Sequence, residues 1–177
     1  MKIETHIREI IKEIDPNNDG LDKTPARISK SYDEFFSGYK TDVSQIANTF
    51  YDSEMNDWVI LKNIPFESHC EHHMVPIVGV SHIGYIPNGK IIGASKLARI
   101  VDCFAHRLQL QERMTMEIGK TLELVLNTQK VGVHIEAEHF CISHRGVKKH
   151  GAKFITMYFS QELKSELRKE FLTIVAA

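Results

Sequence analysis

The sequence contains no run of apolar residues that approaches the roughly 20 needed for a membrane-spanning helix. Its first residues lack the cationic stretch and following apolar run of a secretory signal peptide. An excess of one charge is missing too, because 22 Lys and Arg stand against 23 Asp and Glu. We therefore expect a cytoplasmic protein without a membrane or nucleic-acid partner, in which any site for a polyanion is built locally.

Cysteine is also scarce, and the three cysteines, Cys70, Cys103 and Cys141, cannot all pair. In a reducing compartment such thiols are core residues, metal ligands or nucleophiles rather than disulfides. Cys103 lies beside Phe104 on the apolar side of a predicted helix, which favours a buried free thiol with no further role. The ten histidines, by contrast, are the outlier in the composition.

At 177 residues the chain is long enough for one domain with a substantial core and short for two. We expect an N-terminal helical segment over residues 1–50, with turn formers over residues 15–20 between two helices, and a catalytic core over residues 51–177. The order of elements predicts an α+β fold, an antiparallel sheet with helices packed on one face. The predicted strands cover residues 58–61, 75–86, 131–137 and 154–159, and the predicted helical stretches in the core cover residues 95–125 and 161–172.

Two of these stretches allow alternatives. Residues 75–86 fit either two strands or one bulged strand, because Gly79 and Gly84 interrupt the pattern. Residues 95–125 fit either two helices or one long kinked helix.

Four Cys and His residues have the spacing of metal ligands. Cys70 and His73 stand three apart in Cys70-Glu71-His72-His73, which brings both side chains onto one turn. His139 and Cys141 stand two apart on a predicted strand, where alternate residues face the same way. Two thiolates with imidazoles form a set that prefers zinc. Spacing alone does not distinguish a closed structural site with all four ligands from a catalytic site.

Further histidines and pairs of cations favour a catalytic site. His69 and His72 crowd the first pair and can carry protons near neutral pH. In a chain with no net cationic excess, clustered cations suggest local phosphate clamps, although one such pair alone is more often a solvated helix face. These cations are Arg27 with Lys30, Lys96 with Arg99, and Arg145.

A carboxylate interrupts the apolar pattern of a predicted helix at Gln111-Glu112. A fixed Glu can accept two parallel hydrogen bonds from the N1 and 2-amino groups of guanine, which adenine does not offer in the same places. Alone, Glu112 would be interpreted as a surface residue. Together with the histidines and the cations, it favours a catalytic site over a structural one.

Taken together, these residues closely resemble the GTP cyclohydrolase I family. The resemblance runs from about Leu21 to Val147 in the family's order and spacing. It rests on Thr24-Pro25-Ala26-Arg27, Cys70-Glu71-His72-His73, the stretch from Ile92 to Val101, the stretch from Arg107 to Arg113, and His139-Phe140-Cys141 followed by Arg145-Gly146-Val147.

The resemblance implies a catalytic zinc site. Its zinc ligands would be Cys70, His73 and Cys141, with water in the fourth position, as is typical of a catalytic zinc. His139 then leaves the closed four-ligand set and takes a catalytic role. The implied residues for proton transfer are His72, His139 and Ser95. The implied substrate-binding residues are Gln111 and Glu112 at the guanine edge, and Arg27, Lys30, Lys96, Arg99 and Arg145 around the triphosphate.

The implied reaction is the zinc-dependent conversion of GTP and water to 7,8-dihydroneopterin triphosphate and formate, the first step of folate and pterin biosynthesis. Zinc would lower the pKa of its water towards roughly 7, which supplies hydroxide to attack C8 of guanine. Ring opening, release of formate, an Amadori rearrangement of the ribose and closure of the pterin ring would follow. The family also implies a tunnelling fold (T-fold), with an oligomeric β-barrel, a homodecamer of two rings and sites between subunits.

Two alternatives remain. A tunnelling-fold relative such as a nitrile reductase acting on a deazaguanine uses a cysteine nucleophile without zinc, and the two Cys/His pairs argue against it. A non-catalytic structural-zinc module would close all four Cys and His around the metal, which an exchangeable fourth ligand would exclude. The stretch from Phe154 to Phe159 is more apolar than the Ser/Thr-rich strand usual in the family, which bears on barrel packing rather than on zinc chemistry.

Overall fold

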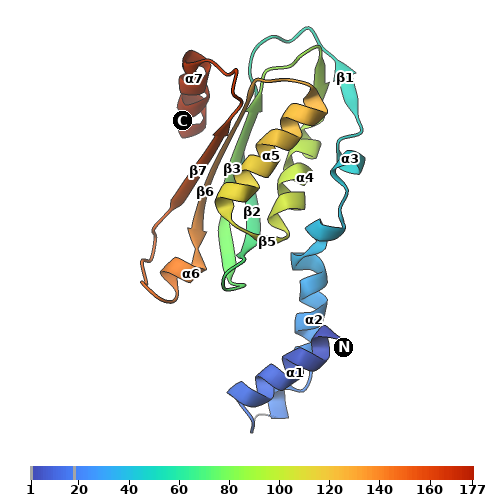
Figure 1. Ribbon diagram of the computed structural model, residues 1–177, viewed down its shortest axis with the longest axis vertical. Coiled ribbons are helices and arrows are strands. Elements are labelled where there is room, and N and C mark those ends of the chain that lie inside the picture. Colours follow the sequence, from blue (N-terminus) through green and yellow to red (C-terminus); the bar gives the residue numbers. More distant parts are fainter. Residues whose placement is uncertain (1, 18) are drawn as a thin grey trace.

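The computed structural model describes residues 2–17 and 19–177. It consists of a sheet flanked by helices and a helical arm that extends from one end of the sheet (Figure 1). The arm contains α1 (Ile3–Ile14), the 3-10 helix η1 (Asp19–Leu21) and α2 (Thr24–Phe35), and α1 packs along α2. Both predicted N-terminal helices are confirmed, while the predicted turn between them includes Asn18, which lies outside the described residues.

The arm joins the rest of the chain through the 3-10 helix η2 (Ser37–Lys40) and the short helix α3 (Val43–Ile46). Gly38 allows a close approach here, since a Cβ at this position would lie 2.2 Å from the carbonyl oxygen of Cys103. The backbone N–H of Gly38 donates to the carbonyl oxygen of His106. This junction fixes where α2 leaves the sheet.

The central sheet has five strands in the order β5-β2-β3-β6-β7. All neighbouring strands are antiparallel except β2 and β5, which run parallel. A separate antiparallel pair joins β1 to β4. The strands are β1 (Phe50–Asp52), β2 (Val59–Cys70), β3 (Pro76–Tyr85), β4 (Lys90–Ile92), β5 (Leu108–Gln109), β6 (Val131–His139) and β7 (Phe154–Phe159).

Strand β2 is much longer than the predicted strand over residues 58–61. A bulge between Leu61 and Ile64 interrupts its pairing with β3, and Asn63 there has a φ of 57°. The irregularity predicted for residues 75–86 therefore lies in the partner strand, while β3 is one continuous strand. Strand β2 therefore continues as far as Cys70, one of the predicted metal ligands.

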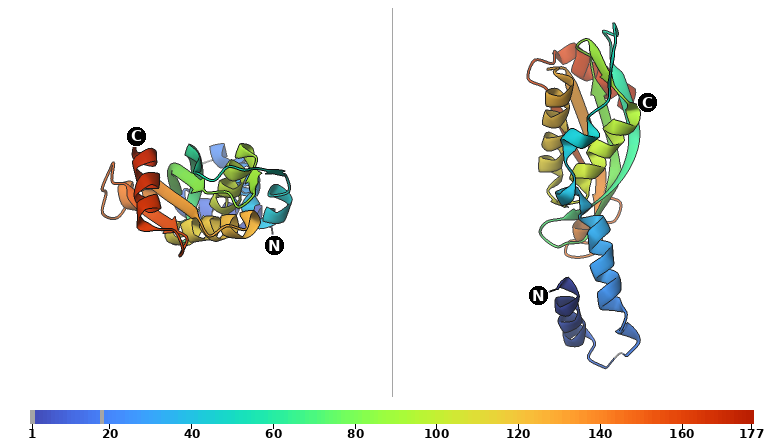
Figure 2. Two further views of the ribbon diagram at one scale, coloured as in Figure 1. Left: turned by 90° about the horizontal axis from the view of Figure 1, so that it is seen from above. Right: turned by 90° about the vertical axis from the view of Figure 1, so that its right-hand side faces the viewer.

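Two long helices cover one face of the sheet, as Figures 1 and 2 show. They are α4 (Ala94–Ala105) and α5 (Gln111–Leu126), so the predicted stretch over residues 95–125 is two helices with β5 between them. The odd-numbered residues of β6 point into this layer, and Val133 and Ile135 are fully buried beside Ile100 and Ile118. This packing confirms the α+β fold with helices on one face of a mainly antiparallel sheet.

The last helix, α7 (Ser165–Ala176), packs against one end of the opposite face. Its Phe171 is fully buried in a second, smaller core cluster with Trp58. Two glycines on neighbouring strands make room for this ring, because a Cβ on Gly84 would lie 2.8 Å from it and a Cβ on Gly132 would lie 3.3 Å from it. On β7 the same face is open to solvent, as the 52% exposure of Met157 illustrates.

Candidate functional site: a metal group beside a cavity

Three of the predicted ligands converge at the end of the sheet where β2 turns into β3. The ligand atoms of Cys70, His73 and Cys141 all lie within 4.8 Å of one another, and no other group of three Cys, His, Asp or Glu in residues 2–17 and 19–177 is comparable. Cys70 is buried at the last position of β2, whereas His73 is exposed. The arrangement can hold a metal ion through two sulfurs and one nitrogen.

The turn after Cys70 is built by its own backbone. The N–H of Cys70 donates to the carbonyl oxygen of Val75, and its carbonyl oxygen accepts from the N–H of Met74 at 2.8 Å. Met74 adopts a φ of 55°, which reverses the chain within one turn. The predicted i to i+3 placement of Cys70 and His73 on one turn is confirmed.

Cys141 reaches the group by a different route from the one predicted. The interpretation that His139 and Cys141 share a strand face is wrong, because β6 ends at His139 and Phe140–Ser143 form the short helix α6. The pairing of β6 with β7 ends at Ala137, and its pairing with β3 ends at His139. Without further strand partners the backbone is free to coil, and one helical turn places Cys141 at the group.

His139 lies outside the metal group and is held by Gln111. Its Nε2 atom is 2.8 Å from Oε1 of Gln111, and its ring packs edge-on against Phe154. Burial lowers the pKa of His139 from its ordinary value, and the carboxylate of Glu112 opposes this shift. The net shift favours the neutral imidazole.

Gln111 is almost completely buried at the start of α5, and its side chain is fully engaged. Its Nε2 atom donates to the carbonyl oxygens of Ile135 and Phe154 and to Oγ1 of Thr156. These acceptors fix the amide so that Oε1 faces His139. The hydrogen bond between them therefore requires a proton on Nε2 of His139, which leaves Nδ1 as its basic nitrogen.

A cavity of about 200 Å³ joins the metal group to the start of α5. Six predicted site residues line it: Cys70, His72, Gln111, Glu112, His139 and Cys141. Arg145 is not among the lining residues but lies beside the metal group, with Nη1 3.2 Å from Nε2 of His73. Its apolar walls are Leu110, Ile142 and Phe154, to which the sequence pattern assigned no role in the site.

Known proteins similar to this chain identify its family. The family model described as GTP cyclohydrolase I matches residues 3–176. The chain belongs to the GTP cyclohydrolase I family. A relative named GTP cyclohydrolase 1 from Bartonella henselae is 46% identical over 180 residues, covering 98% of this chain and 87% of the relative. Another of that name from Thermoanaerobacter pseudethanolicus is 47% identical over 158 residues, covering 88% of this chain and 84% of the relative.

A solved structure extends the comparison to the fold. The crystal structure of the archaeosine synthase QueF-Like in the apo form is 19% identical, with a TM-score of 0.50, and covers 60% of this chain and 96% of that one. This likeness concerns the fold alone, and it agrees with the tunnelling fold implied for the GTP cyclohydrolase I family. No helix in residues 2–17 and 19–177 combines the length and the apolar character of a membrane span.

Within one chain of this family member, the remaining predicted residues lie away from the cavity. Lys96 at the start of α4 donates to Oδ1 of Asn48, and Arg99 lines a different cavity with Cys103. Arg27 and Lys30 line a hollow on α2, in the arm that projects from the sheet (Figure 1). Like these four, Ser95 is absent from the lining of the cavity beside the metal group.

Proposed function

We propose that this protein is a GTP cyclohydrolase I that converts GTP and water to 7,8-dihydroneopterin triphosphate and formate, the first step of folate and pterin biosynthesis. The observation that carries the proposal is the shared cavity, which Glu112 lines together with Cys70 and Cys141. A carboxylate for the guanine edge and a metal group for the ring carbon thereby face the same space. Membership of the family supports the same reaction.

The donor set supports Zn²⁺ as the cofactor, with Cys70, His73 and Cys141 as its ligands. Burial raises the pKa of the Cys141 thiol, and the neighbouring Cys70 raises it further. A divalent cation would compensate both thiolates at once. Bound there, Zn²⁺ would act as a Lewis acid and lower the pKa of water towards about 7.

The position of His139 supports an open zinc site over a closed structural one. In a closed site His139 would be the fourth ligand, but its Nε2 atom is 2.8 Å from Gln111 and it does not belong to the three-residue group. Three protein ligands leave a fourth position for water or substrate. The convergence of two thiols and an imidazole also argues against a nitrile reductase, which uses a cysteine nucleophile without zinc.

Within the cavity each polar side chain has a distinct task. Glu112 accepts hydrogen bonds from N1 and the 2-amino group of guanine, with Gln111 beside it at the guanine edge. His139, held by Gln111, accepts or returns a proton through Nδ1, and His72 serves as the second proton carrier. The apolar wall formed by Phe154 and Ile142 limits the access of water to the base.

The triphosphate requires more cations than one chain brings to the cavity. Arg145 lies beside His73 of the metal group, whereas Arg27, Lys30, Lys96 and Arg99 are elsewhere on the same chain. We therefore assign these four residues, together with Ser95, to cavities of neighbouring subunits in a homo-oligomer. The free edge of β7 and the exposed isoleucines of α1 are suited to subunit contacts, and a decamer with a barrel of sheets is the assembly we expect.

The test is incubation of the purified protein with GTP, followed by oxidation and detection of fluorescent neopterin. We expect a signal that a zinc chelator abolishes and that added Zn²⁺ restores. Folded, zinc-loaded oligomer that yields no neopterin would contradict the proposal. Measurement of the released formate in the same samples distinguishes complete turnover from ring opening without closure.

A further inference from the structure

The turn that carries two metal ligands is tied to α5 by a residue pair to which the chemistry above assigns no role. Glu71 lies between Cys70 and His72, and its carboxylate forms an ion pair with Nη2 of Arg113. Arg113 follows Glu112 directly in the first turn of α5. The pair thus connects the metal-binding turn to the residue that faces the guanine edge.

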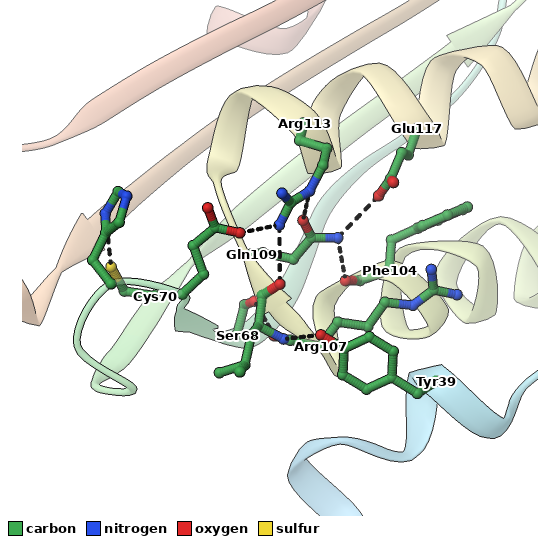
Figure 3. A network of polar contacts seen from close by, with 11 residues as sticks. Tyr39, Ser68, Cys70, Phe104, Arg107, Gln109, Arg113 and Glu117 are labelled. Atoms are coloured by element: carbon green, nitrogen blue, oxygen red, sulfur yellow. Dashed lines mark hydrogen bonds and ion pairs between the residues drawn. The ribbon is translucent and has the colours of Figure 1, made fainter.

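The guanidinium of Arg113 is held at three points. Besides the contact with Glu71, its Nε donates to Oε1 of Gln109 at 3.0 Å and its Nη2 donates to the carbonyl oxygen of Leu108 at 3.1 Å. Figure 3 shows these contacts converging on one planar group. A planar fork with three fixed acceptors allows little rotation, so the position of the Glu71 carboxylate is defined relative to α5.

Gln109 makes this arrangement rigid. Its side chain is only 2% exposed, and its Nε2 donates to the carbonyl oxygen of Phe104 and to Oε2 of Glu117 (Figure 3). These acceptors orient the amide so that Oε1 faces Arg113. A backbone hydrogen bond also joins the metal-binding turn to this residue, because the N–H of Glu71 donates to the carbonyl oxygen of Gln109 at 3.1 Å.

A contribution to stability alone does not account for this pair. The side chains of Glu71 and Arg113 are 30% and 38% exposed, and ion pairs so accessible to water add little to the free energy of unfolding. Their location has a larger consequence for chemistry. A displacement of about 1 Å between reacting groups can lower a rate a hundredfold.

We infer that Glu71 and Arg113 are positioning residues, whose ion pair sets the turn bearing Cys70 and His73 at a defined distance from Glu112. The inference rests on the proposed function in assigning guanine to Glu112 and the metal to the turn. Neither residue lines the cavity in which we place the guanine base. Breaking the pair should lower kcat while metal content and KM for GTP are retained.

The experiment is a double-mutant cycle with Glu71→Gln, Arg113→Gln and both together, in zinc-loaded oligomer. We expect each single variant to lose between about tenfold and a hundredfold in kcat, and the double variant to lose no more than the worse single. Arg113→Lys, which retains the charge without the fork, should lie between wild type and Arg113→Gln. Glu4→Gln, which removes an exposed ion pair with Arg8 in α1, is the matched control and should leave kcat unchanged.

Three outcomes would overturn the inference: wild-type kcat in both single variants, losses that add in the double variant, or a fall in kcat that follows a fall in bound zinc. A purely structural role would lower the unfolding temperature and leave kcat at 25 °C unchanged. Hydrogen exchange provides a readout that does not depend on turnover. Amides of residues 70–75 should exchange faster in either single variant, and unchanged exchange would contradict the inference even if the wild-type protein failed to turn over GTP.

Discussion

The Nε2 atom of His139 lies 2.8 Å from Oε1 of Gln111, and His139 is not part of the metal group formed by Cys70, His73 and Cys141. The amide of Gln111 cannot turn away, because its Nε2 already donates to two backbone carbonyl oxygens and to Thr156. A buried glutamine whose every polar atom is used is a costly residue to change. Its position fixes the orientation of the His139 ring, to which we assign proton transfer.

Replacement of Gln111 by methionine should therefore impair turnover more than metal binding. Gln111→Met keeps the approximate volume and removes the acceptor for His139, so we expect kcat to fall between about tenfold and a hundredfold with zinc retained. The matched control is Thr156→Val, which removes one partner of the amide but leaves the contact with His139. Steady-state kinetics and zinc analysis on both variants check this, and equal losses in the two would contradict an orienting role.

Glu112→Ala should abolish the recognition of guanine and leave the metal bound, because the carboxylate lines the cavity and is not among the three ligands. We expect kcat/KM for GTP to fall by about a hundredfold or more, as buried polar groups of the base lose their partner. Comparison with inosine triphosphate, which lacks the 2-amino group, gives the sharper measurement. Wild type should prefer GTP, and the variant should discriminate much less between the two nucleotides. Loss of zinc equal to the loss of activity would contradict the assignment.

Removal of single thiols should distinguish Cys141, a proposed metal ligand, from Cys103, which lies outside the metal group. Cys141→Ser should lose most of the bound zinc and the cyclohydrolase activity, since two ligands hold zinc far more weakly than three. Cys103→Ser is the control, because Cys103 is buried beside Thr41 and lies outside the metal group. Zinc analysis after dialysis against a weak chelator should show about one zinc per chain in wild type and in Cys103→Ser. Retention of zinc by Cys141→Ser would contradict the ligand assignment.

Acid should destabilise the protein through a largely buried histidine pair on the face of the sheet that packs against α7. His82 and His134 are cross-strand partners with ring centroids 5.4 Å apart, and Lys62 and Glu136 face them. Burial lowers the pKa of both imidazoles from the ordinary value of about 6.5. The Nδ1 atom of His134 has no hydrogen-bond partner among the described residues.

The direction of this pH effect on stability depends on how many protons the folded and unfolded states bind. Between the lowered folded pKa values and the unfolded value of about 6.5, the unfolded chain binds more protons, so the free energy of unfolding falls as pH drops through this range. Urea unfolding at pH 7.5, 6.5 and 5.5 measures it, and His134→Gln should flatten the dependence compared with wild type. His6→Gln, in the exposed helix α1, should retain the wild-type slope. An unchanged slope in His134→Gln would show that other groups dominate.

Local patterns were sufficient for much of the fold. The isoleucines of α1 repeat with helical spacing, and the alternation from Val131 to Ala137 marks a strand with one buried face, and both elements form as predicted. Cys70 and His73 converge because only one turn separates them. In these cases the interactions that decide the structure lie within a few residues, where sequence spacing is a direct guide.

The predictions from sequence fail where contacts between residues far apart in the chain determine the local structure. Strand β2 extends to Cys70 because β3 pairs with it along most of its length, although its own alternation beyond Leu61 is weak. The chain coils at Phe140 because β6 runs out of partners, which the spacing of His139 and Cys141 does not reveal. The Glu71–Arg113 pair joins residues 42 positions apart, beyond the range of any local pattern.

The sequence by itself determined the chemistry of this protein: which side chains can bind a metal, which can accept protons, which can recognise guanine, and which family they match. Only the tertiary structure decided their arrangement, with Cys141 on a helical turn, His139 bound to Gln111, and the cations of α2 and α4 away from the cavity of their own chain. The physical reason is that a residue's chemistry is covalent and local, whereas its location depends on strand pairing and packing between segments far apart in the chain.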